Sequence, residues 1–219
     1  MTTEKPAQAP APKAPAPKAP DASRRSERSR RAIYDAALAL VTEAGYAKTT
    51  VEGIAARAGV GKQTIYRWWP SKAAVLLDAF LDLAAQADEA LGGDADSGIP
   101  DTGDLAADLR YVLRATVDEL NDPKYDGPTR ALAAEGLVSP EFAARMTEVL
   151  MEPQLARYER RLEAAREDGD IAADADVRIA AELLTAPLAH RWQYRTRPLT
   201  HAYADALLTH VLRGLSPRP

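Results

Sequence analysis

The stretch from Thr49 to Lys72, TTVEGIAARAGVGKQTIYRWWPSK, carries more structural information than any other part of this 219-residue chain. Apolar residues recur at helical spacing on both sides of an Ala-Gly pair, which predicts two short helices joined by a tight turn. Thr49, with Glu52 three residues later, predicts a capping box that opens the first helix. Ala55 and Ala58 are small enough to let the two helices pack closely. The stretch therefore predicts a helix-turn-helix.

The second helix of this motif carries polar residues that indicate nucleic-acid binding. Cationic, amide and hydroxyl side chains are the groups that donate to phosphates and to the edges of bases. The candidates are Lys62, Gln63, Thr64, Tyr66 and Arg67. Short helices joined by an Ala-Gly turn also occur in all-α proteins that bind no DNA, so the motif alone leaves a purely structural role open.

The charge of the chain is divided unevenly. Residues 1–72 hold 13 basic and 6 acidic residues, a formal charge of +7, whereas residues 73–219 hold 15 basic and 26 acidic residues, a formal charge of −11. This division predicts a module that binds a polyanion, joined to a body that does not. Ordinary variation of charge along a chain is the alternative. An arginine-rich stretch from Arg24 to Arg31 favours DNA contact for part of that segment.

Helical periodicity continues through the rest of the chain, and no segment shows the sustained alternation of a strand. We expect helices over residues 24–44, 71–91, 105–120, 129–137 and 139–169, the last kinked at Pro153, and two more after caps at Asp176 and Thr200. Ser71 is the expected cap of the second of these, which should end at Gly92–Gly93. The fold class predicted is therefore all-α.

The elements group into two domains behind a tail. A three-helix, N-terminal helix-turn-helix DNA-binding domain is expected over residues 23–70, and a larger helical domain over residues 71–215. Residues 1–22 form a Pro/Ala/Lys tail with six prolines between Pro6 and Pro20, a density that favours disorder over a helix. The tail is either an inert spacer, which we favour, or a source of sequence-independent affinity for DNA through its lysines.

Composition excludes several classes of protein. The chain has no cysteine, so disulfides and Cys-ligated zinc or iron–sulfur sites are ruled out. No apolar run approaches the roughly 18 residues that cross a bilayer, and the N-terminus lacks the apolar stretch of a signal peptide. We therefore expect a cytoplasmic protein that binds no membrane. Three histidines, without a glycine-rich phosphate loop or an HExxH motif, argue against an enzyme, a metal site or a bound cofactor.

The helix-turn-helix stretch resembles the DNA-binding signature of TetR-family transcriptional regulators. The matching positions are Thr49–Thr50, Ile54–Ala55, Ala58–Gly59–Val60, Tyr66, Trp69 and Pro70–Ser71–Lys72. The preceding helix and the total length also fit. The chain departs from the pattern at Gly61, where many relatives carry serine, and this puts any contact by residue 61 in doubt.

The resemblance implies roles for individual residues. Lys62, Gln63 and Thr64 would face the major groove from the start of a recognition helix. Tyr66 and Lys72 resemble phosphate-contacting residues, and Thr50 would touch the DNA backbone. Trp69 takes the place of a core aromatic, whereas its neighbour Trp68 is free to lie against the DNA backbone. The expected DNA contacts are Arg31, Thr50, Lys62, Gln63, Thr64, Tyr66, Arg67 and Lys72.

The resemblance also implies a homodimer in which the last two long helices of each subunit pair in a four-helix bundle. The candidate faces are Ile179/Leu183/Leu184/Leu188 and Leu207/Leu208/Val211/Leu212, and packing within the subunit is the alternative for both. A pocket for an unknown small molecule is expected among the middle helices. Its candidate lining is Tyr111, Arg114, Tyr125, Phe142, Met146, Met151, Trp192 and Tyr194, each of which is also compatible with ordinary core or surface.

The function expected from these observations is that of a sequence-specific, nucleoid-associated transcriptional regulator. The family's commoner behaviour is repression, with release from a palindromic operator by a small-molecule ligand, and activation stays open. The alternative is a non-specific architectural DNA-binding protein. Both weaken with salt, but only a regulator retains a preference for one sequence.

Overall fold

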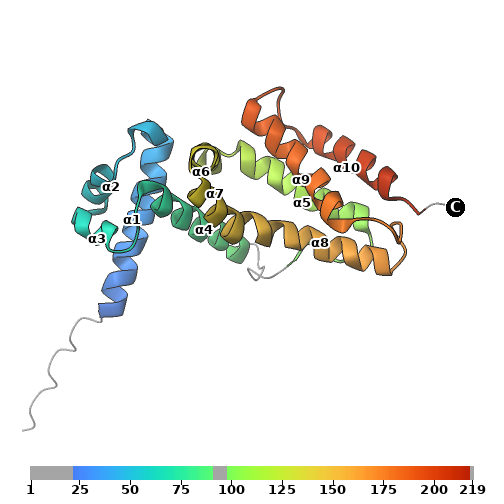
Figure 1. The fold of residues 1–219 in the computed structure, drawn as a ribbon, viewed down its shortest axis with the longest axis horizontal. Helices are drawn as coiled ribbons and strands as arrows, with labels where there is room; N and C mark the ends of the chain where they lie inside the picture. Colours follow the sequence, from blue (N-terminus) through green and yellow to red (C-terminus); the bar gives the residue numbers. More distant parts are fainter. Residues whose placement is uncertain (1–21, 91–97, 218–219) are drawn as a thin grey trace, which may run out of the picture.

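The computed structural model describes residues 22–90 and 98–217, and these residues form helices without a single strand (Figure 1). The elements are α1 (Ala22–Ala44), a 3-10 turn (Tyr46–Lys48), α2 (Val51–Ala58), α3 (Lys62–Tyr66), α4 (Lys72–Ala90), α5 (Leu105–Asn121), α6 (Pro123–Val138), α7 (Pro140–Met146), a π-helical turn (Thr147–Met151), α8 (Glu152–Glu167), α9 (Val177–Tyr194) and α10 (His201–Leu215). The all-α prediction is confirmed. The predictions for the tail and for Gly92–Gly93 concern segments outside the described residues. None of the described helices is long and apolar enough to cross a membrane.

Helices α1, α2 and α3 pack together at one end of the molecule (Figure 1). Their core contains the fully buried Ile33, Ile54 and Ile65. Trp69 is also buried; it packs edge-to-face on Tyr34, with ring centres 5.7 Å apart, and its indole N–H donates to Asp78 at 2.8 Å. Because Val75 and Ala79 of α4 belong to the same core, the packing continues beyond residue 70 into the connecting helix.

The start of α2 lies one residue later than expected. Thr50 is the N-cap, and its hydroxyl accepts from the N–H of Gly53 at 3.0 Å. Thr49 is buried, and its hydroxyl donates instead to the carbonyl of Gly45 at 3.0 Å, closing the preceding turn. The prediction of a capping box at Thr49 is therefore wrong, because that side chain is already committed to the turn.

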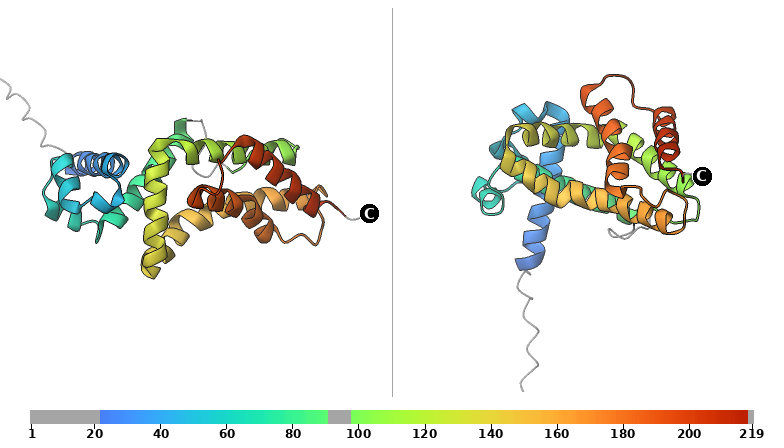
Figure 2. Two further views of the ribbon diagram at one scale, coloured as in Figure 1. Left: turned by 90° about the horizontal axis from the view of Figure 1, so that it is seen from above. Right: turned by 45° about the vertical axis from the view of Figure 1, so that its right-hand side comes forward.

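The larger part of the molecule is a bundle of α5, α8, α9 and α10 around a second core. Helix α6 packs against α1, α4 and α5, and Figure 2 shows it crossing the molecule between the three-helix end and this bundle. The helix expected over 129–137 is longer than predicted: Asp122 accepts from the N–H of Lys124 at 2.8 Å, and Pro123 occupies the first turn. The caps expected at Ser71, Ser139, Asp176 and Thr200 are confirmed.

The helix is irregular just before Pro153, where the sequence predicts a kink. A π-helical turn, Thr147–Met151, separates α7 from α8 immediately before this proline. Proline has no N–H to continue the regular ladder, and a wider turn accommodates the interruption.

A buried ion pair links α5 to α8. Asp108 and Arg161 are each 3% exposed, and Arg161 donates to the Asp108 carboxylate at 2.9 and 3.1 Å. Asp108 also accepts from the N–H and the hydroxyl of Thr102, at 3.1 and 2.7 Å. Burial by itself raises the pKa of the Asp108 carboxyl, but the hydrogen bonds from Thr102 and Arg161 outweigh it, and the pKa lies below its ordinary value.

Candidate nucleic-acid interface

The outer face of α3 is an exposed surface on a rigid support. Gly59 ends α2 in the left-handed conformation, with φ of 67°, a backbone geometry that favours glycine. The inner face of α3 is held by Ile65, which is fully buried, whereas Lys62, Gln63 and Tyr66 are exposed. The structure therefore brings these three residues together on one outward surface.

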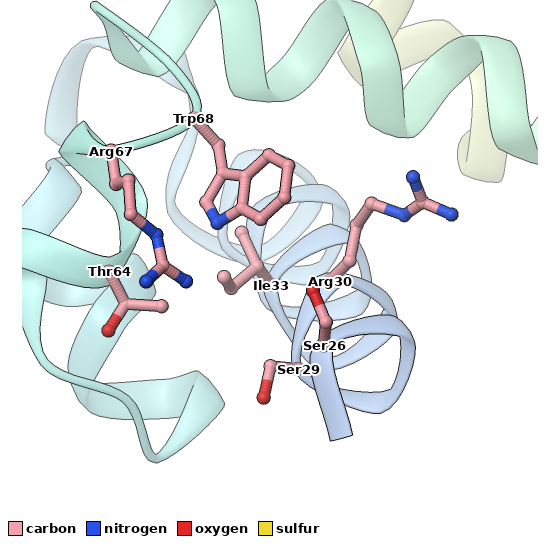
Figure 3. A pocket seen from close by; sticks show the side chains of 7 residues that line it. All are labelled: Ser26, Ser29, Arg30, Ile33, Thr64, Arg67 and Trp68. Carbon is pink, nitrogen blue, oxygen red and sulfur yellow. The ribbon is translucent and has the colours of Figure 1, made fainter. Parts of the chain in front are cut away.

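A cleft of about 210 Å³ lies between α3 and the first half of α1 (Figure 3). We call it the α1–α3 cleft; it is lined by Ser26, Ser29, Arg30, Ile33, Thr64, Arg67 and Trp68. Trp68 is 55% exposed, and the guanidinium of Arg67 lies 5.3 Å from the centre of its ring. The two tryptophans thus divide as expected, with Trp69 in the core and Trp68 at the surface.

Two of the predicted DNA contacts also have structural roles. The Thr50 hydroxyl accepts the cap hydrogen bond, which leaves its own proton available to a phosphate. The Lys72 ammonium donates to the carbonyls of Tyr46 and Thr49, both at 2.8 Å, and lies 4.1 Å from the centre of the Tyr46 ring. Lys72 therefore links the start of α4 to the turn that leads into α2. The chain separation of these partners explains why no local sequence signal indicated the link.

Arg30 and Arg31, which are adjacent in α1, contact different parts of the molecule. Arg31 binds Asp82 of α4 at 2.6 Å and also donates to Gln86, with Asp35 at 3.8 Å. Arg30 is the neighbour that lines the α1–α3 cleft. Helical phase carries part of this signal. Arg30 precedes the buried Ile33 and Tyr34 by three and four residues, whereas Arg31 precedes the buried Tyr34 by three and the exposed Asp35 by four.

Carboxylates already pair with some of the basic residues of the helix-turn-helix. Arg57 donates to both oxygens of Glu43, at 2.5 and 2.7 Å, and these hydrogen bonds lower the pKa of the Glu43 carboxyl. Lys62 lies 4.0 Å from Glu52, and both side chains are more than 60% exposed. A weak, solvated pair of this kind leaves Lys62 able to exchange its partner for a phosphate.

Three of the residues expected to line a ligand pocket lie close together. Tyr125 is buried and packs edge-to-face on Phe80, with ring centres 6.3 Å apart. Phe142 and Met146 pack against the same cluster between α4, α6 and α7. The structure therefore groups these three residues beside the connecting helix.

The other candidates for that pocket are dispersed. Trp192 lies in the second core, donates to Asp126 at 2.7 Å and packs against the Arg130 guanidinium. Arg114 pairs with Asp205 of α10 at 2.5 Å. Tyr111, Met151 and Tyr194 are exposed at the surface. The pocket stays a prediction, since these side chains do not line one common space with the first three.

The candidate dimer faces also divide. Leu184, Leu188 and Leu208 are almost completely buried within the subunit, so for these residues the alternative of internal packing applies. Ile179 and Leu183 of α9 are 55% and 50% exposed. Leu207, Val211 and Leu212 of α10 are partly buried against the core. Of the candidate dimer residues on α9, Ile179 and Leu183 are therefore the two that face outward.

Comparison with known families matches most of the described chain. Residues 33–79 match the model of bacterial regulatory proteins of the tetR family, and residues 99–211 match a tetracyclin repressor-like C-terminal domain. The chain is 27% identical over 192 residues to YdeS of Bacillus subtilis, an uncharacterized HTH-type transcriptional regulator; the match covers 87% of this chain and 91% of YdeS. It is 29% identical to the DNA-binding transcriptional repressor TetR of Mycobacteroides abscessus; the match covers 86% of this chain and 94% of that repressor.

Solved structures share this architecture. The TetR family transcription regulator SCO0332 is 30% identical, with a TM-score of 0.68 over 87% of this chain and all of that one. The regulator FadR of Bacillus subtilis, solved in complex with stearoyl-CoA, is 22% identical with a TM-score of 0.66, over 84% of this chain and 98% of FadR, and shares the fold. The chain therefore belongs to the TetR family of helix-turn-helix transcriptional regulators, non-enzymatic proteins that bind DNA and form dimers.

Proposed function

We propose that this protein is a sequence-specific repressor that binds a palindromic operator as a homodimer and leaves it when a small molecule binds. The observation that carries the proposal is the outer face of α3, where Lys62, Gln63 and Tyr66 are exposed on a helix fixed by the buried Ile65. A two-fold dimer presents two such helices, which suits half-sites about 34–36 Å apart.

The proposed contacts fall into two groups. Lys62, Gln63 and Thr64 stand at the start of α3, where side chains of this kind reach base edges in the major groove. Thr50, Tyr66, Arg67 and Lys72 surround this face with groups that donate to phosphates. Arg31, the remaining contact expected from the sequence, already donates to Asp82.

Release by a ligand is supported by the way α6 joins the two parts of the molecule. Arg130 of α6 donates to the carbonyls of Trp192 and Gln193 at the end of α9, at 2.9 and 3.1 Å. The same helix packs against α1 and α4. A ligand among Tyr125, Phe142 and Met146 would act on α6 by binding one arrangement of these helices better than the other. The stearoyl-CoA complex of FadR is a precedent within this fold.

The proposal is tested by fluorescence anisotropy with the full-length protein and DNA from upstream of its own gene, with shuffled DNA as competitor, at two salt concentrations. A regulator keeps its preference for the upstream DNA in the presence of the shuffled competitor. Equal binding to both DNAs at both salt concentrations supports the architectural alternative or an operator elsewhere. Absence of binding even at low salt contradicts both functions.

Gln63→Ala should reduce the preference for operator over shuffled DNA. Glutamine recognises adenine through two hydrogen bonds, and a pair of this kind is worth about 1–3 kcal/mol of discrimination, or roughly 5- to 150-fold. Gln154→Ala, at an exposed glutamine of α8, is the matched control and should leave the ratio of affinities unchanged. An unchanged ratio in Gln63→Ala would show that Gln63 does not contact a base.

Arg31→Ala separates contact with DNA from support of α1. Its guanidinium binds Asp82 and Gln86, so we expect a modest loss of stability, about 0.2–1 kcal/mol for an exposed pair, and no change in the salt dependence of DNA binding. The measurement is a series of binding curves in increasing KCl. A slope of log K against log salt that is less steep by about 0.9 would instead support the direct phosphate contact expected from the sequence.

A further inference from the structure

The α1–α3 cleft has the chemistry of an anion site. Five of its seven lining residues carry donors on hydroxyl groups or guanidinium groups, Trp68 adds an indole N–H, and none is acidic. We propose that this cleft binds one phosphodiester of the DNA backbone, beside the outer face of α3. The inference rests on the proposed function, because it takes DNA to be the partner of α3.

The geometry of the cleft suits a phosphate group. Figure 3 shows Trp68 above Ile33, with Arg67 on one side of the indole and Arg30 on the other. The contact between Arg67 and the Trp68 ring, at 5.3 Å, orients a guanidinium beside the indole N–H. Arg67 and the indole N–H lie on the same side of the ring and can donate to the free oxygens of a phosphodiester, and Arg30 adds a positive charge on the other side of the indole.

The size of the cleft points to the same ligand. Its volume is about 210 Å³, below the roughly 300–1,000 Å³ of sites for drug-sized molecules. The cleft is accessible from solvent, because Trp68 is 55% exposed and Arg67 beside it is also exposed. A group that projects from a large polyanion can therefore enter, and the rest of the polymer can remain outside.

The opposite side of α1 has a different chemistry. A groove of about 550 Å³ between α1 and α4 is lined by three carboxylates, Asp35, Glu43 and Asp82. Arg31, which pairs with Asp82, belongs to that side, whereas Arg30 lines the α1–α3 cleft. In that groove Arg31 binds Asp82, Arg57 binds Glu43, and Lys124 also lines the space, so its charges are largely paired with one another, whereas the lining of the α1–α3 cleft contains no carboxylate.

The test measures the salt dependence of DNA binding by the full-length protein. Arg30→Ala removes one cation, so the slope of log K against log KCl should become less steep by about 0.9. Between 50 and 200 mM KCl the wild type should then lose about three- to fourfold more affinity than the variant. Trp68→Phe keeps an aromatic ring but removes the N–H, and should weaken binding to operator and shuffled DNA by the same factor.

Arg160→Ala, at an exposed arginine of α8, is the charge-matched control and should keep the wild-type slope. A slope for Arg30→Ala equal to that of the control, together with unchanged affinity in Trp68→Phe, overturns the inference. If that result accompanies clear preference of the wild type for its operator, the proposed function stands and only the cleft assignment fails. If the wild type shows no preference but Arg30→Ala still lowers the slope, the proposed specific repressor fails and the cleft assignment stands.

A last arm uses free inorganic phosphate as a competitor of the DNA phosphate. Binding is repeated at constant ionic strength with chloride partly replaced by inorganic phosphate. We expect inorganic phosphate to compete for the donors of the cleft, so that the wild type loses more affinity for DNA than Arg30→Ala does. An equal loss in both proteins, together with a salt slope of Arg30→Ala equal to that of the Arg160→Ala control, overturns the proposed contact with DNA.

Discussion

Asp108→Ala should lower the free energy of unfolding by about 3–5 kcal/mol, because it leaves the Arg161 guanidinium buried without its main carboxylate. Two hydrogen bonds from Arg161 and two from Thr102 are lost with it. For a protein of this size the midpoint of thermal unfolding should fall by about 10 °C, measured by circular dichroism at one fixed protein concentration. The pair links α5 to α8, so the loss concerns the larger domain.

Asp101→Ala is the matched control for that prediction. Its carboxylate also lies 3.3 Å from Arg161, but it is 58% exposed, and removing it should cost at most about 1 kcal/mol. The double variant Asp108→Ala/Arg161→Met removes the buried charge as well and should recover part of the loss. A cost below about 1 kcal/mol for Asp108→Ala would contradict the assignment of this pair as a buried support.

The pH dependence of stability is an independent test of the same ion pair. Hydrogen bonds hold the pKa of Asp108 below its ordinary value. The carboxylate therefore makes its full contribution to the free energy of unfolding at pH values above the unfolded pKa of about 3.9. The contribution is lost as the pH falls through the lower, folded pKa. The difference in stability between wild type and Asp108→Ala should therefore be constant near neutral pH and become smaller in acid.

The sequence predicts most of the fold because its signals are local. The glycine after Ala58, the caps at Ser139, Asp176 and Thr200, and the break at Pro153 each act within a few residues, and each lies where expected. The cap at Thr49 was mispredicted because two adjacent threonines offer the same local signal. Only the turn at Gly45, which uses the first hydroxyl, decides between them.

The candidate interface could be predicted in part for the same reason. The exposed residues of α3 follow from the helical phase around the buried Ile65. Arg31 and Lys72 differ, because their partners lie far along the chain, at Asp82 and at the carbonyls of Tyr46 and Thr49. Long-range pairs of this kind leave no periodic trace in a single sequence, and the same limit applies to a pocket that several helices would build together.

Lys72→Met should affect both stability and DNA binding, because Lys72 supports the helix-turn-helix and stands at its edge. The substitution keeps an apolar side chain but removes two charged hydrogen bonds to the carbonyls of Tyr46 and Thr49, at a cost of about 2–4 kcal/mol. The positive charge of its ammonium group also attracts a DNA phosphate. We therefore also expect a decrease of about 0.9 in the salt slope of DNA binding, measured well below the unfolding midpoint.

Lys124→Met is the matched control for Lys72→Met. The Lys124 ammonium lies 5.5 Å from the ring centre of Tyr125, on the exposed surface of α6. This substitution therefore removes the same charge from a similar contact with an aromatic ring. It should change stability by less than about 1 kcal/mol and leave the salt slope unchanged. Equal effects of the two substitutions would rule out a specific role for Lys72. A loss of stability in Lys72→Met with an unchanged slope would make it a positioning residue, acting on DNA only through the turn that leads into α2.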